Sequence, residues 1–189
     1  GPERTPSPRP DGVLAAVPFT GRARSIVLGM KYRNRRAVAR HLAGLVVNRV
    51  IERGLADPID VVTWAPTSAK RRRERGFDQG EMIARTVARQ LGRPCRRLLE
   101  RSDGSGSQTG RSRSERLTGP QIVARPGLSG RRVLVVDDVV TTGATLLACR
   151  DALTARGADS LLAAVAATPD SRVAEVVPLR RRHVPAPAA

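Results

Sequence analysis

Two adjacent acids and a hydroxyl-rich turn stand close together in the C-terminal half of the chain. Asp137 and Asp138 directly follow the predicted strand Arg132–Val136, and the turn Thr141–Thr145 (Thr-Thr-Gly-Ala-Thr) comes two valines later. The N–H groups and hydroxyls of such a turn, at the start of a helix, bind phosphate. Because like charges repel, the two acids suit the hydroxyls of a ribose, or a hydrated divalent ion, rather than the phosphate itself. The combination predicts a site for a ribose 5-phosphate.

Each residue taken alone also has a local structural interpretation. The acids could simply end a strand, and Thr142 or Thr145 could cap the following helix. The combination of strand, acid pair and glycine-containing turn favours the binding site.

The segments around this motif alternate between strand and helix patterns. Apolar runs predict strands, and apolar residues three or four positions apart predict helices. The predicted strands are Val13–Val17 (as an edge strand), Ile59–Trp64, Arg96–Leu99, Arg132–Val136 and Ser160–Ala167. The predicted helices are Gly21–Tyr32, Arg36–Arg53, Gln79–Leu91 and Thr145–Arg156. The alternation predicts an α/β fold with a doubly wound, mostly parallel sheet of about five strands.

Composition divides the chain into one domain and two tails. Residues 1–12 are rich in proline and predict a disordered segment, residues 13–168 carry the alternating pattern, and residues 169–189 predict a flexible tail. The Ser/Gly/Arg-rich stretch Arg101–Pro120 predicts a mobile loop, which could be a lid over a site or a plain linker.

Positive charge dominates the composition. The 189 residues carry 34 Lys and Arg against 17 Asp and Glu, a net charge of +17, and only Lys31 and Lys70 are lysines. Arginine suits phosphate, so a polyanion is a possible partner, although a solvated arginine-rich surface has the same composition. Two cysteines cannot supply a four-ligand zinc site. The chain has no apolar run long enough for a membrane span and no signal-peptide pattern at its start, so we expect a cytoplasmic protein without membrane insertion.

The motif from Val133 to Thr145 resembles the phosphoribosyl diphosphate (PRPP) signature of type I phosphoribosyltransferases. Three further elements are similar to the ComF (competence protein F) branch of that family. They are Leu28-Gly29-Met30-Lys31-Tyr32, the run Arg73–Gln79 (Arg-Glu-Arg-Gly-Phe-Asp-Gln), and Gln108 with Glu115-Arg116. The resemblance covers residues 21–167 and implies a type I phosphoribosyltransferase-like fold with a mobile loop.

The resemblance implies an enzyme that transfers 5-phosphoribosyl from PRPP to an acceptor and releases pyrophosphate. It implies Asp137 and Asp138 at the ribose hydroxyls, and at the 5-phosphate the residues Thr141, Thr142, Gly143, Ala144 and Thr145. The turn after Trp64 resembles the family's pyrophosphate loop, with Thr67, Ser68, Lys70 and Arg75 as the residues expected there. Mg²⁺ is expected to arrive with PRPP, held by its oxygens and by the two acids through water. No catalytic residue is identified.

Three departures from the family pattern matter. Asp78 stands where the ComF signature has asparagine, and it adds negative charge beside a cationic loop. Thr141 stands where purine-using relatives have an acid that acts as base, which disfavours a 6-oxopurine acceptor handled in that way. The four-cysteine zinc element common in the ComF branch has no counterpart in these residues.

The alternative hypothesis is a non-catalytic ComF-type accessory of DNA uptake that binds a nucleotide or single-stranded DNA. The net charge of +17 fits a phosphate-backbone partner, whereas four aromatic residues leave little for base stacking. The acceptor and the oligomeric state, a homodimer included, stay open.

Overall fold

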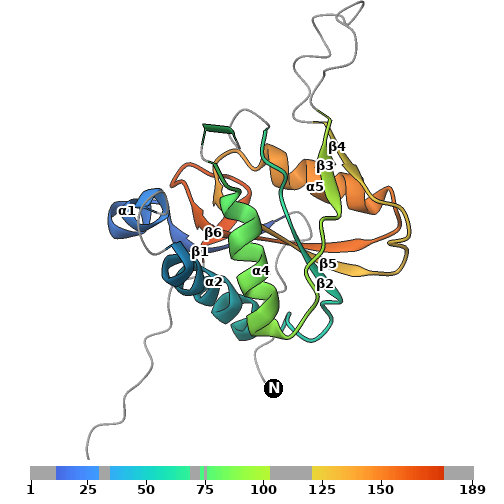
Figure 1. Cartoon of the computed structure of the whole chain (residues 1–189), viewed down its shortest axis with the longest axis horizontal. Coiled ribbons are helices and arrows are strands. Elements are labelled where there is room, and N and C mark those ends of the chain that lie inside the picture. The colour runs from blue at the N-terminus through green and yellow to red at the C-terminus, as the bar shows by residue number, and fades with distance from the viewer. Residues whose placement is uncertain (1–11, 30–34, 69–72, 75, 103–120, 177–189) are drawn as a thin grey trace, which may run out of the picture.

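A computed structural model describes residues 12–29, 35–68, 73–74, 76–102 and 121–176, which form two sheets and four labelled helices (Figure 1). The larger sheet has the strand order β2-β5-β6-β1-β7, and every pairing in it is parallel. The smaller sheet is the antiparallel pair β3-β4. The strands are β1 (Val13–Pro18), β2 (Val61–Trp64), β3 (Leu99–Arg101), β4 (Ile122–Ala124), β5 (Arg132–Val140), β6 (Asp159–Ala167) and β7 (Ala174–Val176). The helices are α1 (Gly21–Gly29), α2 (Arg35–Glu52), α4 (Gln79–Leu91) and α5 (Ala144–Thr154).

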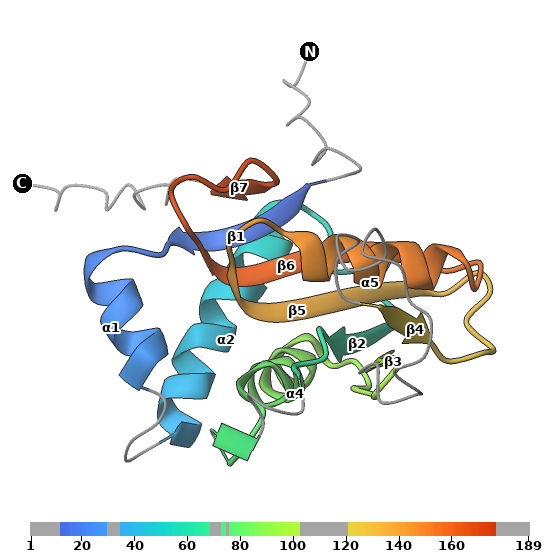
Figure 2. The ribbon, with the colours of Figure 1, turned by 90° about the horizontal axis from the view of Figure 1, so that it is seen from above.

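Helices cover both faces of the parallel sheet, which confirms the predicted fold class (Figure 2). Leu134 and Val136 of β5 pack into one core cluster with α2 and α4. Val133 and Val135 point to the opposite face and pack with α5. A strand buried on both faces needs apolar residues at consecutive positions, and this is why Val133–Val136 shows no alternation.

The C-terminal part of the sheet differs from the prediction. Residues 174–176 lie in the segment expected to be a flexible tail, yet they form β7, which pairs with β1 from Val13 to Ala15. The N–H of Val13 also donates to the carbonyl of Val173. The sheet therefore continues beyond residue 168, and β1 is an inner strand rather than an edge strand. Three residues are too short to show a periodic pattern, so the pairing partner, not the local sequence, makes this strand.

Most other boundaries agree with the sequence within a few residues. Strand β5 continues to Val140 and so contains Asp137 and Asp138, whereas the predicted strand stopped at Val136. Strand β5 continues because it pairs with β6 as far as Ala167. Its last two residues, Val139 and Val140, are β-branched and favour a strand. The strand predicted at Arg96–Leu99 begins only at Leu99. Residues 103–120 of the predicted mobile loop lie outside the described residues. Each helix in the described part of the chain is too short or too polar to cross a membrane.

Candidate functional site

A cavity of about 780 Å³ opens at the carboxyl ends of the parallel strands, where ligands of such sheets bind. Its walls come from the turn after β2, from the end of β5 with the turn that follows it, and from the segment after β1. Strands β2 and β5 are neighbours, so their two turns lie side by side. The lining residues are Phe19, Val27, Leu28, residues 65–68, Glu74, Gln79, Arg101 and residues 137–146.

The two adjacent acids line this cavity near the end of β5. The N–H of Asp138 donates to Oδ1 of Asp137 at 2.8 Å, and the N–H of Val139 donates to Oδ1 of Asp138 at 2.7 Å. Burial raises the pKa of Asp137 well above its usual range, and the negative charge of Asp138 raises it further. Asp78 acts in the same direction. A cation, or hydroxyls that donate to these carboxylates, would relieve this repulsion.

The turn after β5 opens helix α5 with its N–H groups available. Gly143 is the N-cap with φ +83°, a conformation that favours glycine, and it has no side chain to occupy the helix end. Thr142 Oγ1 accepts from the N–H of Ala144 at 3.3 Å. Among the described residues, none accepts a hydrogen bond from the N–H of Thr142, Gly143 or Thr145. The sequence-predicted phosphate residues are thus gathered around a free helix N-terminus, as an anion site requires.

Val173 closes the back of this turn. A Cβ added at Gly143 would overlap Cγ2 of Val173, so glycine is required for space as well as for conformation. Val173 directly precedes β7, and its carbonyl accepts from Val13. The turn is therefore backed by the part of the chain that was expected to be a tail, and the sequence carried no signal for this packing.

The turn after β2 is held by hydrogen bonds to the carboxylate of Asp78. Thr67 Oγ1 donates to Oδ2 of Asp78 at 2.8 Å, while Oδ1 of the same carboxylate accepts from the N–H of Glu81 at 3.2 Å. Asp78 is therefore the N-cap of α4, and one carboxylate ties the turn to the helix. Ser68 lines the cavity, whereas Lys70 and Arg75 lie outside the described residues.

Asp78 was singled out from the sequence only as an added negative charge. The spacing Asp78-x-x-Glu81 before an apolar periodic run is the pattern of a helix start, and it could have shown the capping role. Nothing in the local sequence indicates the bond from Thr67, because it joins residues 11 positions apart.

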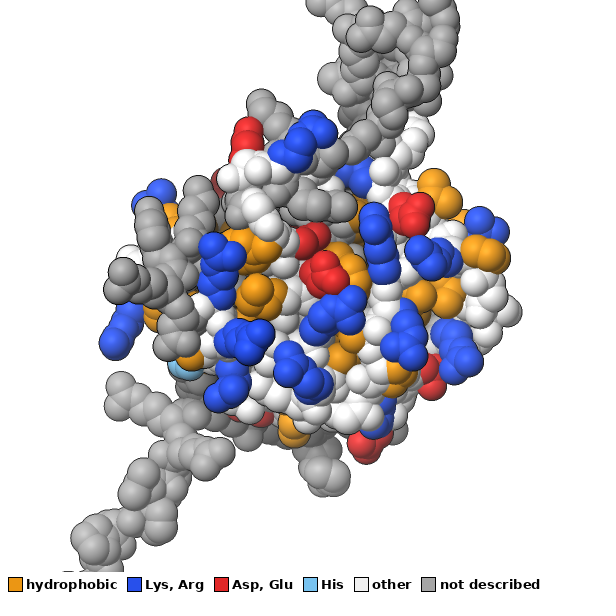
Figure 3. All heavy atoms as spheres, viewed as in Figure 1, with side chains coloured by type: hydrophobic (Ala, Val, Ile, Leu, Met, Phe, Trp, Pro, Cys, Tyr) orange, Lys and Arg blue, Asp and Glu red, His pale blue; other side chains and the backbone are white. Residues whose placement is uncertain are grey.

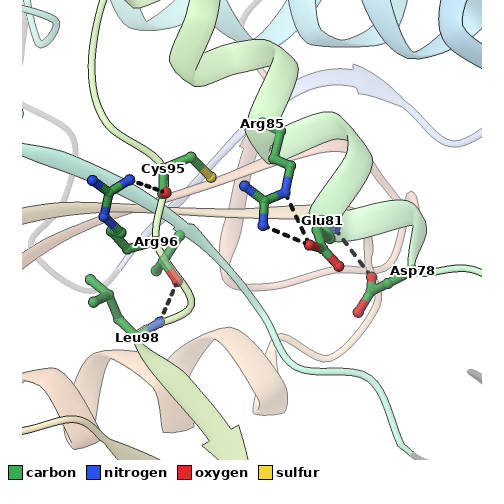
Figure 4. A network of polar contacts seen from close by, with 7 residues as sticks. Asp78, Glu81, Arg85, Cys95, Arg96 and Leu98 are labelled. Atoms are coloured by element: carbon green, nitrogen blue, oxygen red, sulfur yellow. Dashed lines mark hydrogen bonds and ion pairs between the residues drawn. The ribbon is translucent and has the colours of Figure 1, made fainter.

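A polar network continues from α4 to β3 (Figure 4). Arg85 pairs with Glu81 at 2.9 Å, one turn after the cap, and the guanidinium of Arg85 lies 5.4 Å from the ring centre of Trp64. Beyond the helix, the N–H of Leu98 donates to Thr63 Oγ1 at 3.3 Å. These interactions join α4 and the segment before β3 to strand β2, and so they fix both flanks of the turn after β2.

The two cysteines have no sign of reactivity. Burial raises the pKa of the Cys149 thiol above its ordinary value, and the negative charge of Asp137 adds to the effect. Burial also raises the pKa of Cys95, although Arg85 opposes it. Both are free thiols, and no group of three or more potential metal ligands occurs among the residues that the structure describes.

Several cavity residues, Arg101 and Leu146 among them, were not singled out from the sequence as site residues. Phe19 and Val27 line the cavity beside Leu28, which the sequence showed only as part of a family-like element. The Gln79 amide donates to the carbonyl of Val27 at 3.5 Å and so joins α1 to the start of α4.

A protein family and several solved structures are similar to this chain. The phosphoribosyl transferase domain family matches residues 78–179, more than half of the 189-residue chain. No curated protein matches. Similar solved structures include an adenine phosphoribosyltransferase (17% identity, 72% of this chain and 73% of that chain, TM-score 0.49). A purine phosphoribosyltransferase from Pyrococcus horikoshii Ot3 is 21% identical over 74% of this chain and 78% of that chain, with a TM-score of 0.47. With its matched segment running from the cap of α4 to beyond β7, the chain belongs to the phosphoribosyl transferase domain family.

Proposed function

We propose that this protein is a cytoplasmic ComF-type phosphoribosyltransferase, which binds PRPP and transfers its 5-phosphoribosyl group to an acceptor. The observation that carries the proposal is the meeting of Asp137, Asp138 and the free N-terminus of α5 in one cavity. The ComF assignment rests on the Leu28–Tyr32 and Arg73–Gln79 elements of the sequence. We further propose that one domain extends from residue 13 to residue 176.

PRPP would lie across the two neighbouring turns. Its 5-phosphate would accept from the N–H groups and hydroxyls of Thr141–Thr145, and its ribose hydroxyls would donate to Asp137 and Asp138. Its pyrophosphate would lie at the turn after β2, where Ser68 lines the cavity. The hydroxyl of Thr67 donates to Asp78, so Thr67 would contribute through its backbone rather than its side chain.

Transfer breaks the C1–O bond to pyrophosphate and builds positive charge on the ribose. The carboxylates of Asp137 and Asp138 would stabilise that charge because they are fixed beside the sugar before the reaction. They also fit Mg²⁺ held through water, since this ion keeps several waters and takes one or two carboxylates with substrate phosphates. When bound, Mg²⁺ would neutralise the charge of the leaving pyrophosphate. Lys70 and Arg75 remain candidates for the same role from the sequence.

Pyrophosphate release, measured with PRPP, Mg²⁺ and a panel of nucleobases and amines, tests this proposal. We expect release with at least one acceptor, and a decrease of at least about 100-fold in the Asp137→Asn/Asp138→Asn variant, the scale of removing one group that stabilises transition-state charge. The exposed Asp159→Asn is the matched control, because its side chain is 82% exposed at the opposite end of β6. Release that is unchanged in the double variant would contradict the proposed role of the acids.

A second function is favoured by the surface. Figure 3 shows many basic side chains on the face that carries α2, α4 and β3. The exposed arginines of these elements and of the segment between α4 and β3 are Arg35, Arg36, Arg40, Arg85, Arg89, Arg96 and Arg97. This face, the arginine face, suits the phosphate backbone of single-stranded DNA.

Binding of a fluorescent oligothymidine at increasing salt tests the arginine face. We expect affinity to fall steeply with salt, and the slope to become shallower in an Arg85→Ser/Arg89→Ser/Arg96→Ser variant, by about 0.7 for each phosphate that the variant no longer neutralises. Arg131→Ser, an exposed arginine between β4 and β5, is the control. No binding near 0.1 M salt would dismiss this function.

A further inference from the structure

A second cavity, of about 390 Å³, lies at the amino ends of the parallel strands. Strands β5 and β6 begin there with Arg132 and Asp159, which are partners in the strand register. Helix α5 connects these two strands, so it runs back along them (Figure 2), and its last residue, Thr154, reaches the same end. The segment between α2 and β2 forms a further wall. This is the amino-end cavity.

Two arginines from different elements line the amino-end cavity. Arg132 is the first residue of β5, and Arg150 lies on α5. The side chain of Arg132 is 48% exposed and that of Arg150 is 26% exposed, so both rest partly against the protein. Guanidinium groups bind phosphates and carboxylates through paired N–H donors. Two such groups in one cavity favour an anionic ligand.

The carboxylates that pair with these arginines are open to water. Arg132 and Asp159 are 3.8 Å apart, and the Asp159 side chain is 82% exposed. Arg150 pairs at 3.1 Å with its chain neighbour Asp151, whose side chain is 71% exposed. Such pairs contribute little to stability, so a ligand can replace these carboxylates. A carboxylate ligand would replace like with like, whereas a phosphate monoester brings additional charge and three acceptor oxygens.

Apolar side chains form another part of the wall. Leu55 and Leu161 are partly buried against the main core cluster, and Pro58 is exposed. An apolar group on the ligand would remove these side chains from water, which is favourable. The volume of the amino-end cavity is within the range of small-molecule sites, which combine apolar walls with a few charged groups. The cavity therefore suits an anion that also carries a compact apolar group.

Hydrogen bonds fix the wall between α2 and β2. Nε of Arg93 donates to the carbonyl of Ile59 at 2.7 Å. The N–H of Arg132 donates to Oδ2 of Asp60 at 2.8 Å, and the N–H of Asp60 donates to the carbonyl of Arg132 at 2.9 Å. This reciprocal pair ties the segment before β2 to the start of β5. The shape of the amino-end cavity is thus formed before a ligand binds, as is usual for small-molecule sites.

We propose that the amino-end cavity binds a phosphate monoester that carries a compact apolar group. Arg132 and Arg150 hold the phosphate, and Leu55 and Leu161 contact the apolar group. This site is separate from the cavity proposed for PRPP, because the two lie at opposite ends of β5. The inference therefore does not depend on the proposed function.

Calorimetry of the full chain with three probes tests this inference. Phenyl phosphate carries both recognised groups, inorganic phosphate lacks the apolar group, and benzoate has a carboxylate in place of the phosphate. We expect phenyl phosphate to bind about tenfold tighter than either of the other two. In Arg132→Gln/Arg150→Gln its affinity should fall by at least about tenfold. Arg40→Gln/Arg131→Gln removes the same charge from two exposed arginines outside the cavity and should leave the affinity unchanged.

The comparison of variants identifies the site, because the turn after β5 could also bind a phosphate. If phenyl phosphate binds equally well to Arg132→Gln/Arg150→Gln, it binds elsewhere and the inference is wrong. An equal loss in Arg40→Gln/Arg131→Gln would show a general effect of charge and would also overturn it, as would no binding at millimolar phenyl phosphate. Inorganic phosphate or benzoate that binds as tightly as phenyl phosphate would contradict the proposed ligand class. Circular dichroism of both variants checks that the fold is kept.

Discussion

The turns after β2 and β5 follow neighbouring parallel strands, yet their polar groups are bonded in different ways. In the turn after β2, the hydroxyl of Thr67 is already bonded to Asp78, which also caps α4. In the turn after β5, the helix end is capped by Gly143, and among the described residues the N–H groups of Thr142, Gly143 and Thr145 have no acceptor. One turn uses its polar groups for its own structure, and we propose that the other keeps these N–H groups for a ligand.

The difference shows what holds a turn in place when most of its N–H groups have no acceptor within the described part of the protein. The turn after β5 has a hydrogen bond of its own from the N–H of Ala144 to Thr142, and its shape is also held by Gly143 at positive φ against Val173. The turn after β2 is held by the carboxylate of Asp78, which accepts from the hydroxyl of Thr67 and from the N–H of Glu81. This comparison predicts that the two turns respond differently to substitution.

Gly143→Ala should have the largest effect. It combines an unfavourable positive φ with overlap against Val173, and we expect a decrease of about 2–4 kcal/mol in the free energy of unfolding. Chemical denaturation measures it. PRPP binding should be abolished as well, because the backbone can no longer hold its conformation at the anion site.

Gly127→Ala is the matched control for this prediction. Gly127 has φ +81°, close to that of Gly143, but a Cβ there meets nothing within 4 Å. It should cost only about 1 kcal/mol of strain. Val173→Ala should restore part of the stability of Gly143→Ala. Equal destabilisation in the two glycine variants would show that Val173 does not shape the turn.

Asp137→Asn should change how stability depends on pH. A raised pKa means that the folded protein holds the proton more tightly than the unfolded chain, so stability falls as pH rises from the usual Asp range of about 4 through the raised pKa. The variant should remove this fall and be more stable at neutral pH, by about 1.4 kcal/mol for each unit of the shift. Urea denaturation at pH values from about 4 to 8 measures it. If Asp137→Asn has the same pH profile as Asp159→Asn, folding does not raise the pKa of Asp137.

Asp78→Ala should have the smallest effect on stability, about 1–2 kcal/mol from the removal of the cap and of the bond to Thr67. Asp78→Asn keeps an oxygen for the N–H of Glu81 and should be less destabilised. Calorimetry should show weaker binding of PRPP to Asp78→Ala and unchanged binding of ribose 5-phosphate, which does not reach the turn after β2. Equal weakening of both ligands would mean that the two turns are not independent.

The fold was predictable where one element carries its own signal. Helix α4 was predicted with its observed bounds because its apolar residues recur at helical spacing and Gly92, which has a positive φ, ends it. Strand β7 was missed because three residues carry no period, and only β1 makes them a strand.

The candidate site was also predictable only where its residues lie close together in the sequence. Asp137, Asp138 and Thr141–Thr145 lie in one short stretch of the sequence, so their spacing alone suggested a shared ligand. The packing of Val173 against Gly143 and the bond of Thr67 to Asp78 join distant positions, and the position of Val27 and Leu28 in the cavity wall depends on how α1 is placed over the sheet. Tertiary packing decides all three.

Thermal unfolding in the presence of PRPP and Mg²⁺ tests the central claim, that Asp137, Asp138 and the turn after β5 hold a sugar phosphate. At about 100 times the dissociation constant, PRPP should raise the melting temperature by roughly 5–10 °C, and Mg²⁺ alone should not. The Asp137→Asn/Asp138→Asn variant should show no rise. No shift of the unsubstituted protein at millimolar PRPP, or a full shift in the double variant, would contradict the account.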